Sequence, residues 1–478
     1  MKNIFKLENY KFIPRLITIA SGIVLLQLAA LYENKLCNNE KPYVSGEGSY
    51  CRLLAKTKVT YPSNYVWNNY INLKRAFKNG TISGTAADNM DLVKKRFGFF
   101  DNGFTFYYPK ESRENAGFIL LSRADPEKDG VPSIQLWDLN NQSKIMEWDF
   151  NIGKILKDLN YKIPENSFVF SHPLLLKDRS LIMLANVPDN GKLLKFSKES
   201  ELIKYNDEYI FHHSIEKDNQ GKIYVPIITR NPYSKVFADE GFAVLDTDLN
   251  VLKTYSLTRI LKKAGLDHYI FSTKIEDPFH INDVAPLKNN KKTSVVLISI
   301  RSLSSIIAYD LELDKVVWKL HGYGNRQHDV DILNSKGTYI SIFDNNVING
   351  QESNLNFFTT IENLPNLEDN SNKSLVIYNA NSNHKEELLL KIKRQKFNFL
   401  DNLIRPQTNT AGQAEYIIDN DSVFIEESNY GRTFEYDVKK EKLLWQYINR
   451  NDEKNIYFMK FWSRRFKELP FSAKILNN

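Results

Sequence analysis

The stretch Ile306-Ile307-Ala308-Tyr309-Asp310 decides the fold, because it opens a strand–turn–strand unit that recurs along the chain. In each copy an aliphatic or aromatic strand leads into a polar turn with Asp or Asn, and a hydrophobic strand returns. Apolar residues alternate with other residues in these strands, which is the period of a strand with one buried face. Six copies begin at Ile134, Lys192, Phe242, Ile306, Leu375 and Thr433.

A second pair of strands precedes each unit, and polar turns such as 217–221 and 334–337 join its members. The two pairs together make a four-stranded antiparallel sheet, repeated roughly every 40 to 65 residues. Radial packing of six such sheets leaves only short, protected edges around a central channel. We therefore expect an all-β fold, a six-bladed β-propeller over residues 103–450.

The segments outside this repeat are less regular. Residues 33–102 contain stretches of helical spacing and predict a stalk with a small α-rich cap. The loop 345–373 is rich in Asn and Glu and is expected to be an excursion from the fifth blade. Residues 451–478 predict a C-terminal amphipathic segment, with Phe458, Phe461, Trp462 and Phe466 at helix-like spacing.

The N-terminus carries a membrane signal. Residues 1–15 include Lys2, Lys6, Lys11 and Arg15, and an apolar run at 16–32 follows them. That length is near the lower limit of about 17 to 25 residues for a spanning helix, and the basic flank predicts a cytoplasmic N-terminus. We expect a single-pass anchor in the cytoplasmic membrane, with the propeller on the periplasmic or extracellular side. A cleaved secretory signal is the alternative, although 28–31 lacks a convincing cleavage motif.

Cys37 and Cys51 both follow the apolar run, so they would lie on the exported side. We expect them to close a short loop as a disulfide in an oxidising compartment. The charge of the chain is only mildly basic, with 64 Lys and Arg against 57 Asp and Glu and no basic stripe. This pattern argues against nucleic acid as a partner.

Four histidines lie at comparable places, at the start of the innermost strand of successive blades. Innermost strands line the channel of a propeller, so these residues are expected to converge on one axis. A lone histidine at a strand start is often a structural group, and this interpretation suits His172 as well as a functional one. His212 is expected to point away from His213, because successive strand residues face opposite sides. The four are His172, His213, His280 and His328.

Neighbouring residues favour anion chemistry. Asn282 follows His280 by two, which places both on one face of a strand, and Arg301 ends the strand 295–300. A neutral imidazole can attack an electrophilic sulfur or phosphorus, while an arginine stabilises charge on the nonbridging oxygens. A three-histidine zinc site is the alternative that the same residues allow.

The chain resembles the bacterial arylsulfate sulfotransferases over about residues 103–448. The resemblance implies a six-bladed propeller and ping-pong transfer through a sulfohistidine, with no nucleotide donor. It implies that His328 is the nucleophile, and that His213, His280, Asn282 and Arg301 bind sulfate oxygens and assist the leaving phenol. Known members have a β-sandwich before the propeller, which this N-terminal region does not match. The motifs that carry the resemblance are 103–107, 117–120, 212–215, 277–282, 299–301, 327–329 with 343–345, and 431–437.

The expected function is therefore sulfuryl transfer from an aryl sulfate to a phenolic acceptor, without a cofactor or a metal. His328, His213, His280 and Arg301 are the expected catalytic residues, and Asn282, His212 and His172 are expected to bind substrate. A membrane-anchored propeller that binds a ligand or protein without transfer is one alternative. A metal-dependent hydrolase is the other.

Overall fold

The computed structural model describes residues 101–113, 115–185, 187, 191–229, 239–271, 279–287, 293–321, 326–333, 339–345, 354–359, 374–378, 385–389, 411–437, 439–440, 442–451, 456–457 and 461–471. The chain divides into a unit of Met1–Asn89 with Phe271–Thr273, and a unit of Met90–Ile270 with Lys274–Asn478. The described residues belong to the second unit, apart from Phe271. The predicted anchor at 16–32, the predicted cap at 33–102 except its last two residues, and both cysteines lie outside them. No helix within the described ranges is long and apolar enough to cross a bilayer.

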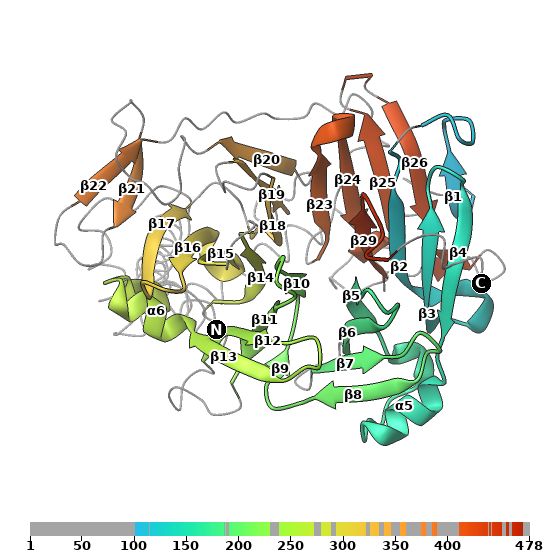
Figure 1. Cartoon of the computed structure of the whole chain (residues 1–478), viewed down its shortest axis with the longest axis horizontal. Coiled ribbons are helices and arrows are strands. Elements are labelled where there is room, and N and C mark those ends of the chain that lie inside the picture. The colour runs from blue at the N-terminus through green and yellow to red at the C-terminus, as the bar shows by residue number, and fades with distance from the viewer. Residues whose placement is uncertain are drawn as a thin grey trace, which may run out of the picture. The chain divides into compact units, whose positions relative to one another are not determined.

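The second unit is mainly β and folds as a β-propeller, which confirms the predicted class. In the described part of the chain it contains five antiparallel sheets of four or five strands (Figure 1). Two short helices lie in connections, α5 (Ile152–Asp158) and α6 (Leu257–Lys263).

The first three sheets follow one another along the chain. The first has the order β29 (Phe461–Phe466), β2 (Phe118–Asp125), β3 (Val131–Asp138), β4 (Ser143–Asp149). The second has the order β5 (Phe170–Leu175), β6 (Leu181–Ala185), β7 (Lys192–Phe196), β8 (Leu202–Asn206). The third has the order β10 (Glu216–Lys217), β11 (Ile223–Ile228), β12 (Glu240–Leu245), β13 (Val251–Ser256), and β9 (Ile210–Phe211) also pairs with β11.

Three further sheets of at least three strands follow the third sheet in the described part of the chain. The fourth has the order β14 (Ile281–Pro286), β15 (Val295–Ile300), β16 (Ser305–Asp310), β17 (Lys315–His321). A three-stranded sheet follows, β18 (Asp329–Ile332), β19 (Tyr339–Asp344), β20 (Asn354–Thr359). The last sheet has the order β23 (Gln413–Ile417), β24 (Ser422–Glu427), β25 (Arg432–Asp437), β26 (Lys442–Ile448), β1 (Gly103–Phe106). Strand β18 packs against both β14 and β23, so the three-stranded sheet lies between the fourth and the last.

The repeated hairpin of the sequence is the third strand of each large sheet together with its return. Its aspartate accepts backbone N–H bonds from residues two or three positions later, which fixes the turn locally. This pattern is present at Asp138, Asp246, Asp310 and Asp437. Large apolar side chains fill the space between neighbouring sheets, for example Trp148, Phe170 and Phe196 between the first and second.

The fifth repeat differs from the prediction. Strands β21 (Ser374–Tyr378) and β22 (Lys385–Leu389) pair with each other as predicted, but as a separate two-stranded sheet. The predicted loop 345–373 contains β20, so that prediction is wrong for Asn354–Thr359. Leu355 and Phe357 alternate with asparagines there, which is a strand pattern within a polar segment.

Both ends of the propeller help to close it. Strand β29 pairs with β2, so a C-terminal strand is the innermost strand of the first sheet, and β1 pairs with β26 at the outer edge of the last. The predicted helix-like spacing is therefore wrong for Phe461–Phe466, which alternates in burial as a strand does. Two further strands of this region, β27 (Arg450–Asn451) and β28 (Ile456–Tyr457), pair with each other.

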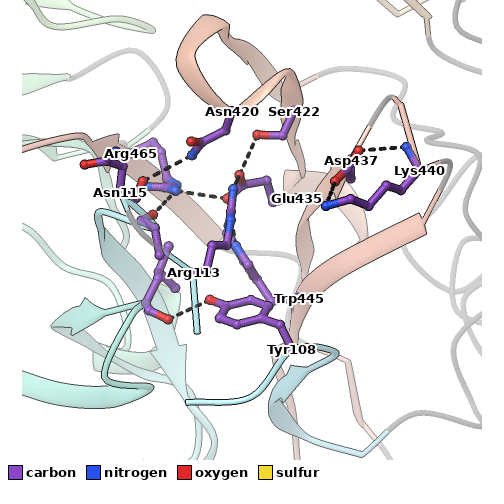
Figure 2. Close-up of polar contacts among 12 residues, drawn as sticks. Tyr108, Arg113, Asn115, Asn420, Ser422, Glu435, Asp437, Lys440, Trp445 and Arg465 are labelled. Atoms are coloured by element: carbon purple, nitrogen blue, oxygen red, sulfur yellow. Dashed lines mark hydrogen bonds and ion pairs between the residues drawn. The ribbon is translucent and has the colours of Figure 1, made fainter. Parts of the chain in front are cut away.

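A buried carboxylate, Glu435 on β25, joins these closing segments (Figure 2). It accepts bonds from Arg465 of β29 (2.9 Å), from Ser422 (2.6 Å) and from Trp445 (2.8 Å), and it pairs with Arg113. Burial acts to raise its pKa, but the charges of Arg465 and Arg113 lower the pKa of Glu435 to about 2. Glu435 thus links the segment before β2, through Arg113, to β29, through Arg465.

Candidate active site

The innermost strands bring the predicted histidines to the centre of the propeller. His172 lies in β5, His213 shortly before β10, and His280 and His328 directly before β14 and β18. The φ angles of His172, His213 and His280 are 50°, 59° and 52°, a left-handed conformation that is uncommon for residues other than glycine. Such strain is concentrated at functional sites, where the surrounding fold supports it.

Three imidazoles form a hydrogen-bonded chain. The Nδ1 atoms of His212 and His213 are 2.6 Å apart, and the Nε2 atoms of His213 and His280 are 3.2 Å apart. The His213 ring centroid also lies 6.1 Å from that of His328. The prediction that His212 faces away from His213 is therefore wrong. Both residues lie in the connection between β9 and β10, and the positive φ of His213 breaks the strand alternation on which the prediction rested.

His328 is held in one tautomer. Its Nδ1 lies 2.6 Å from the Oδ1 of Asn345, whose Nδ2 donates to the carbonyl O of Ala411 at 3.0 Å. That second bond orients the amide, so Oδ1 accepts and Nδ1 of His328 carries the proton. Its Nε2 is buried and has no hydrogen-bond partner among the described residues. The lone pair of His328 is therefore on Nε2.

The surroundings keep this imidazole neutral. His328 is 6% exposed. Burial and the nearby charge of Arg301 lower the pKa of His328 to about 3, against the opposing effect of the Asn345 bond. Arg301 begins the short η4 helix (Arg301–Leu303) directly after β15, and its backbone N–H donates to the carbonyl O of His280 at 3.0 Å. The charge of Arg301 thus acts on a neutral imidazole.

Asn282 contacts the backbone of the neighbouring blade, and its predicted role in binding sulfate stays a prediction. Its Nδ2 donates to the carbonyl O of Gln327 at 2.6 Å, so its amide donor ties β14 to the residue before His328. The pairing of β14 with β15 shifts register between Ile281 and Asp283, which disturbs the alternation expected for His280 and Asn282. Asn345 was not predicted as a site residue, although the motif 343–345 was recognised. The pairing of motif 343–345 with motif 327–329 was the signal that could have identified it.

His172 lies on the side of the site formed by β29. Its ring centroid is 6.2 Å from that of Trp462. Burial and the charge of Arg464 lower the pKa of His172 to about 3. Burial and the neighbouring histidines, His212 first among them, lower the pKa of His213 well below its usual value.

A cavity of about 290 Å³ lies among the innermost strands, and none of the clustered histidines lines it. Asp329, which follows His328, is one of its lining residues, together with Glu216, Asp331, Gln413 and Arg464. No group of histidine, cysteine and carboxylate side chains within the described ranges is arranged to hold a metal ion. The zinc alternative therefore gains no geometric support from this part of the chain.

The fold and the site together define a β-propeller with a neutral, oriented imidazole and a cation at its centre. A family model for arylsulfotransferase (ASST) matches residues 172–450, and the chain belongs to this family. All the clustered histidines lie within the matched residues. No curated protein matches the sequence.

Solved structures are similar at low sequence identity. A protein of unknown function from Bacteroides caccae is 11% identical with a TM-score of 0.42, over 73% of this chain and 100% of that one. The β-propeller domain of Cps50 (Swd1) from Myceliophteria thermophila is 9% identical with a TM-score of 0.39, over 72% and 85%. TolB from Acinetobacter baumannii is 9% identical with a TM-score of 0.40, over 73% and 67%. These similarities carry no information on activity.

Proposed function

We propose that this protein transfers a sulfuryl group from an aryl sulfate to a phenolic acceptor through a sulfohistidine at His328. Membership of the arylsulfotransferase family supports the reaction class. The observation that carries the assignment is the buried Nε2 of His328, which has no described hydrogen-bond partner while Asn345 holds Nδ1. A neutral imidazole with an oriented lone pair is a competent nucleophile.

In the first half-reaction, Nε2 of His328 attacks the sulfur of the aryl sulfate. The N–S bond forms as the S–O bond to the aryl group breaks, and the electron pair leaves on the phenolate oxygen. That oxygen takes the additional proton of a singly protonated His213–His280 pair, whose Nε2 atoms lie 3.2 Å apart, and the pair is left neutral. The negative charge of the bound aryl sulfate favours protonation of this pair, and Arg301 stabilises the charge on the sulfuryl oxygens.

In the second half-reaction, the acceptor phenol returns a proton to the same pair. Its oxygen attacks sulfur, the N–S bond breaks, and the electron pair returns to Nε2 of His328. Atoms and charge balance over the two steps, so the chemistry needs no cofactor. The chain His212–His213–His280 spreads the proton over three rings, since each N···N bond shares one hydrogen.

The propeller would have six blades. The three-stranded sheet β18–β20 occupies the position between the fourth and the last sheet, and we assign it as the core of the fifth blade. The apolar run at 16–32 would anchor the chain in the cytoplasmic membrane, with the propeller outside. Protease protection of tagged termini in sealed vesicles tests this orientation.

Transfer from 4-nitrophenyl sulfate to phenol tests the function. We expect 4-nitrophenol release that depends on the acceptor and follows ping-pong kinetics. His328→Ala should reduce release to background, while His268→Gln, outside the cluster, should retain it. Binding of aryl sulfate by the wild type without any exchange would instead support a propeller that binds ligands but does not transfer sulfate.

A further inference from the structure

Side chains of the innermost strands bond each sheet to the next around the channel. Ser214 Oγ accepts from the backbone N of Val284 at 3.3 Å. Asp283 Oδ2 accepts from the backbone N of Val330 at 3.2 Å. Asp329 Oδ2 accepts from the backbone N of Ala414 at 3.1 Å. These three bonds connect the third sheet to the fourth, the fourth to β18, and β18 to the last sheet.

Two more side chains continue the series through the first sheet. Gln413 Nε2 donates to the carbonyl O of Ser463 on β29. Arg464 Nε, also on β29, donates to the carbonyl O of Pro173 at 2.9 Å, and its Nη2 donates to that of Ile215 at 2.5 Å. We call these five side chains the channel ring. The ring comprises Ser214, Asp283, Asp329, Gln413 and Arg464.

The channel ring is in register with the candidate active site. His213 immediately precedes Ser214, Asn282 precedes Asp283, and His328 precedes Asp329. The bond that holds the Asp329 side chain to the next sheet also holds the backbone where it joins His328, whose own N–H donates to the carbonyl O of Phe343 at 3.1 Å. We propose that Asp283 and Asp329 are positioning residues of the proposed sulfuryl-transfer site, holding Asn282 and His328 through bonds to the next blade. This inference rests on the proposed function.

Asp283 and Asp329 are acids next to a site that would bind a negatively charged aryl sulfate. They would repel this substrate if they were ionised. Asp283 is 3% exposed, and burial and the charge of Glu216 raise the pKa of Asp283 to about 7. Burial and the charges of Asp331 and Asp283 raise the pKa of Asp329 well above its usual value. Below those pKa values the acids are uncharged beneath the site. Loss of their protons at alkaline pH would place negative charge next to the sulfuryl group.

Other charged groups also face this pair. Glu216 and Lys217 of β10, Asp331 of β18, Glu415 of β23 and Glu468 line the adjoining cavity, as do Arg464 and Arg465 of β29. Apart from Asp329, four of the lining residues are acids and three are bases, so their formal charges nearly cancel. Loss of the protons of Asp283 and Asp329 therefore makes the electrostatic potential near His328 more negative.

The test compares full-length Asp329→Ala and Asp329→Asn with Asp331→Ala. Asparagine keeps an acceptor oxygen for Ala414, alanine removes it, and Asp331→Ala removes a carboxylate from the same cavity. We expect Asp329→Ala to lower kcat for transfer by about 10- to 100-fold with KM within about threefold, because small displacements of reacting groups are costly. Asp329→Asn should restore at least a third of kcat and weaken the alkaline fall in rate.

A second readout does not depend on turnover. Histidine ring ¹⁵N shifts should show one tautomer of His328 in the wild type and Asp331→Ala, and a mixture in Asp329→Ala, with thermal melting as the folding control. Equal kcat and a single tautomer in all three variants would overturn the inference. If the wild type shows no transfer but the tautomer difference persists, the proposed function fails and the positioning role stands.

Discussion

The Nδ1 of His328 lies 2.6 Å from the Oδ1 of Asn345, so a side chain at the end of β19 sets the reactive nitrogen at the start of β18. Replacing Asn345 by leucine removes the hydrogen-bond acceptor of Nδ1, so His328 can adopt either neutral tautomer. We expect Asn345→Leu to lower kcat by about 10- to 100-fold, because a fraction of the imidazoles would present N–H to the sulfur. Steady-state kinetics and circular dichroism check this, and an unchanged kcat would mean that Nδ1 needs no partner.

The lowered pKa of His328 predicts that the rate of the first half-reaction does not fall at mildly acidic pH. A histidine whose pKa is about 3 in the folded protein is neutral throughout the range where a free imidazole titrates, near 6.5. Single-turnover release of 4-nitrophenol should therefore vary less than about twofold between pH 6 and pH 4.5, a range that lies below the pKa of about 7 of Asp283. A decline in rate centred near pH 6.5 would contradict this if it persists when each of the other clustered histidines is replaced, because His328 would then be the group that titrates.

The bond between His213 and His280 predicts a dependence on the leaving group. Phenols of high pKa need a proton as they depart, whereas 4-nitrophenolate leaves readily without one. We expect His213→Gln to reduce the rate about 10-fold with 4-nitrophenyl sulfate and by at least about 100-fold with phenyl sulfate. Similar losses for both donors would assign His213 to substrate binding alone.

The lowered pKa of Glu435 predicts that the propeller loses stability at low pH. Its pKa is about 2 in the folded protein and near 4.3 in an unfolded chain, so its contribution is complete above the unfolded value and is lost as the pH falls toward 2. Glu435→Gln leaves Arg465 and Arg113 buried without a counter-charge, which costs about 3–5 kcal/mol. Urea unfolding at pH 7 should show this loss, and the two proteins should converge near pH 2. Lys440→Gln, which replaces an exposed ammonium paired with Asp437, is the control and should change stability by less than about 1 kcal/mol.

The sequence predicted the blades because their signals are local: alternation within strands, and Asp138 or Asp310 bonding its own turn. It did not predict that β29 joins the first sheet. Phe461, Trp462 and Phe466 satisfy a helical spacing too, and the partner strand lies at the other end of the fold. The chain of imidazoles was missed for another reason. The rings of His212 and His213 are in contact because His213 has a positive φ rather than strand geometry. No residue pattern predicts a positive φ at a histidine.

The most direct test of covalent transfer is peptide mass spectrometry after a brief incubation with 4-nitrophenyl sulfate and no acceptor. The mechanism predicts a sulfuryl group of about 80 Da on the peptide containing His328, absent in His328→Ala and discharged by adding phenol. Turnover with no modified His328, or a sulfuryl group carried by His213 or His280 instead, would contradict it.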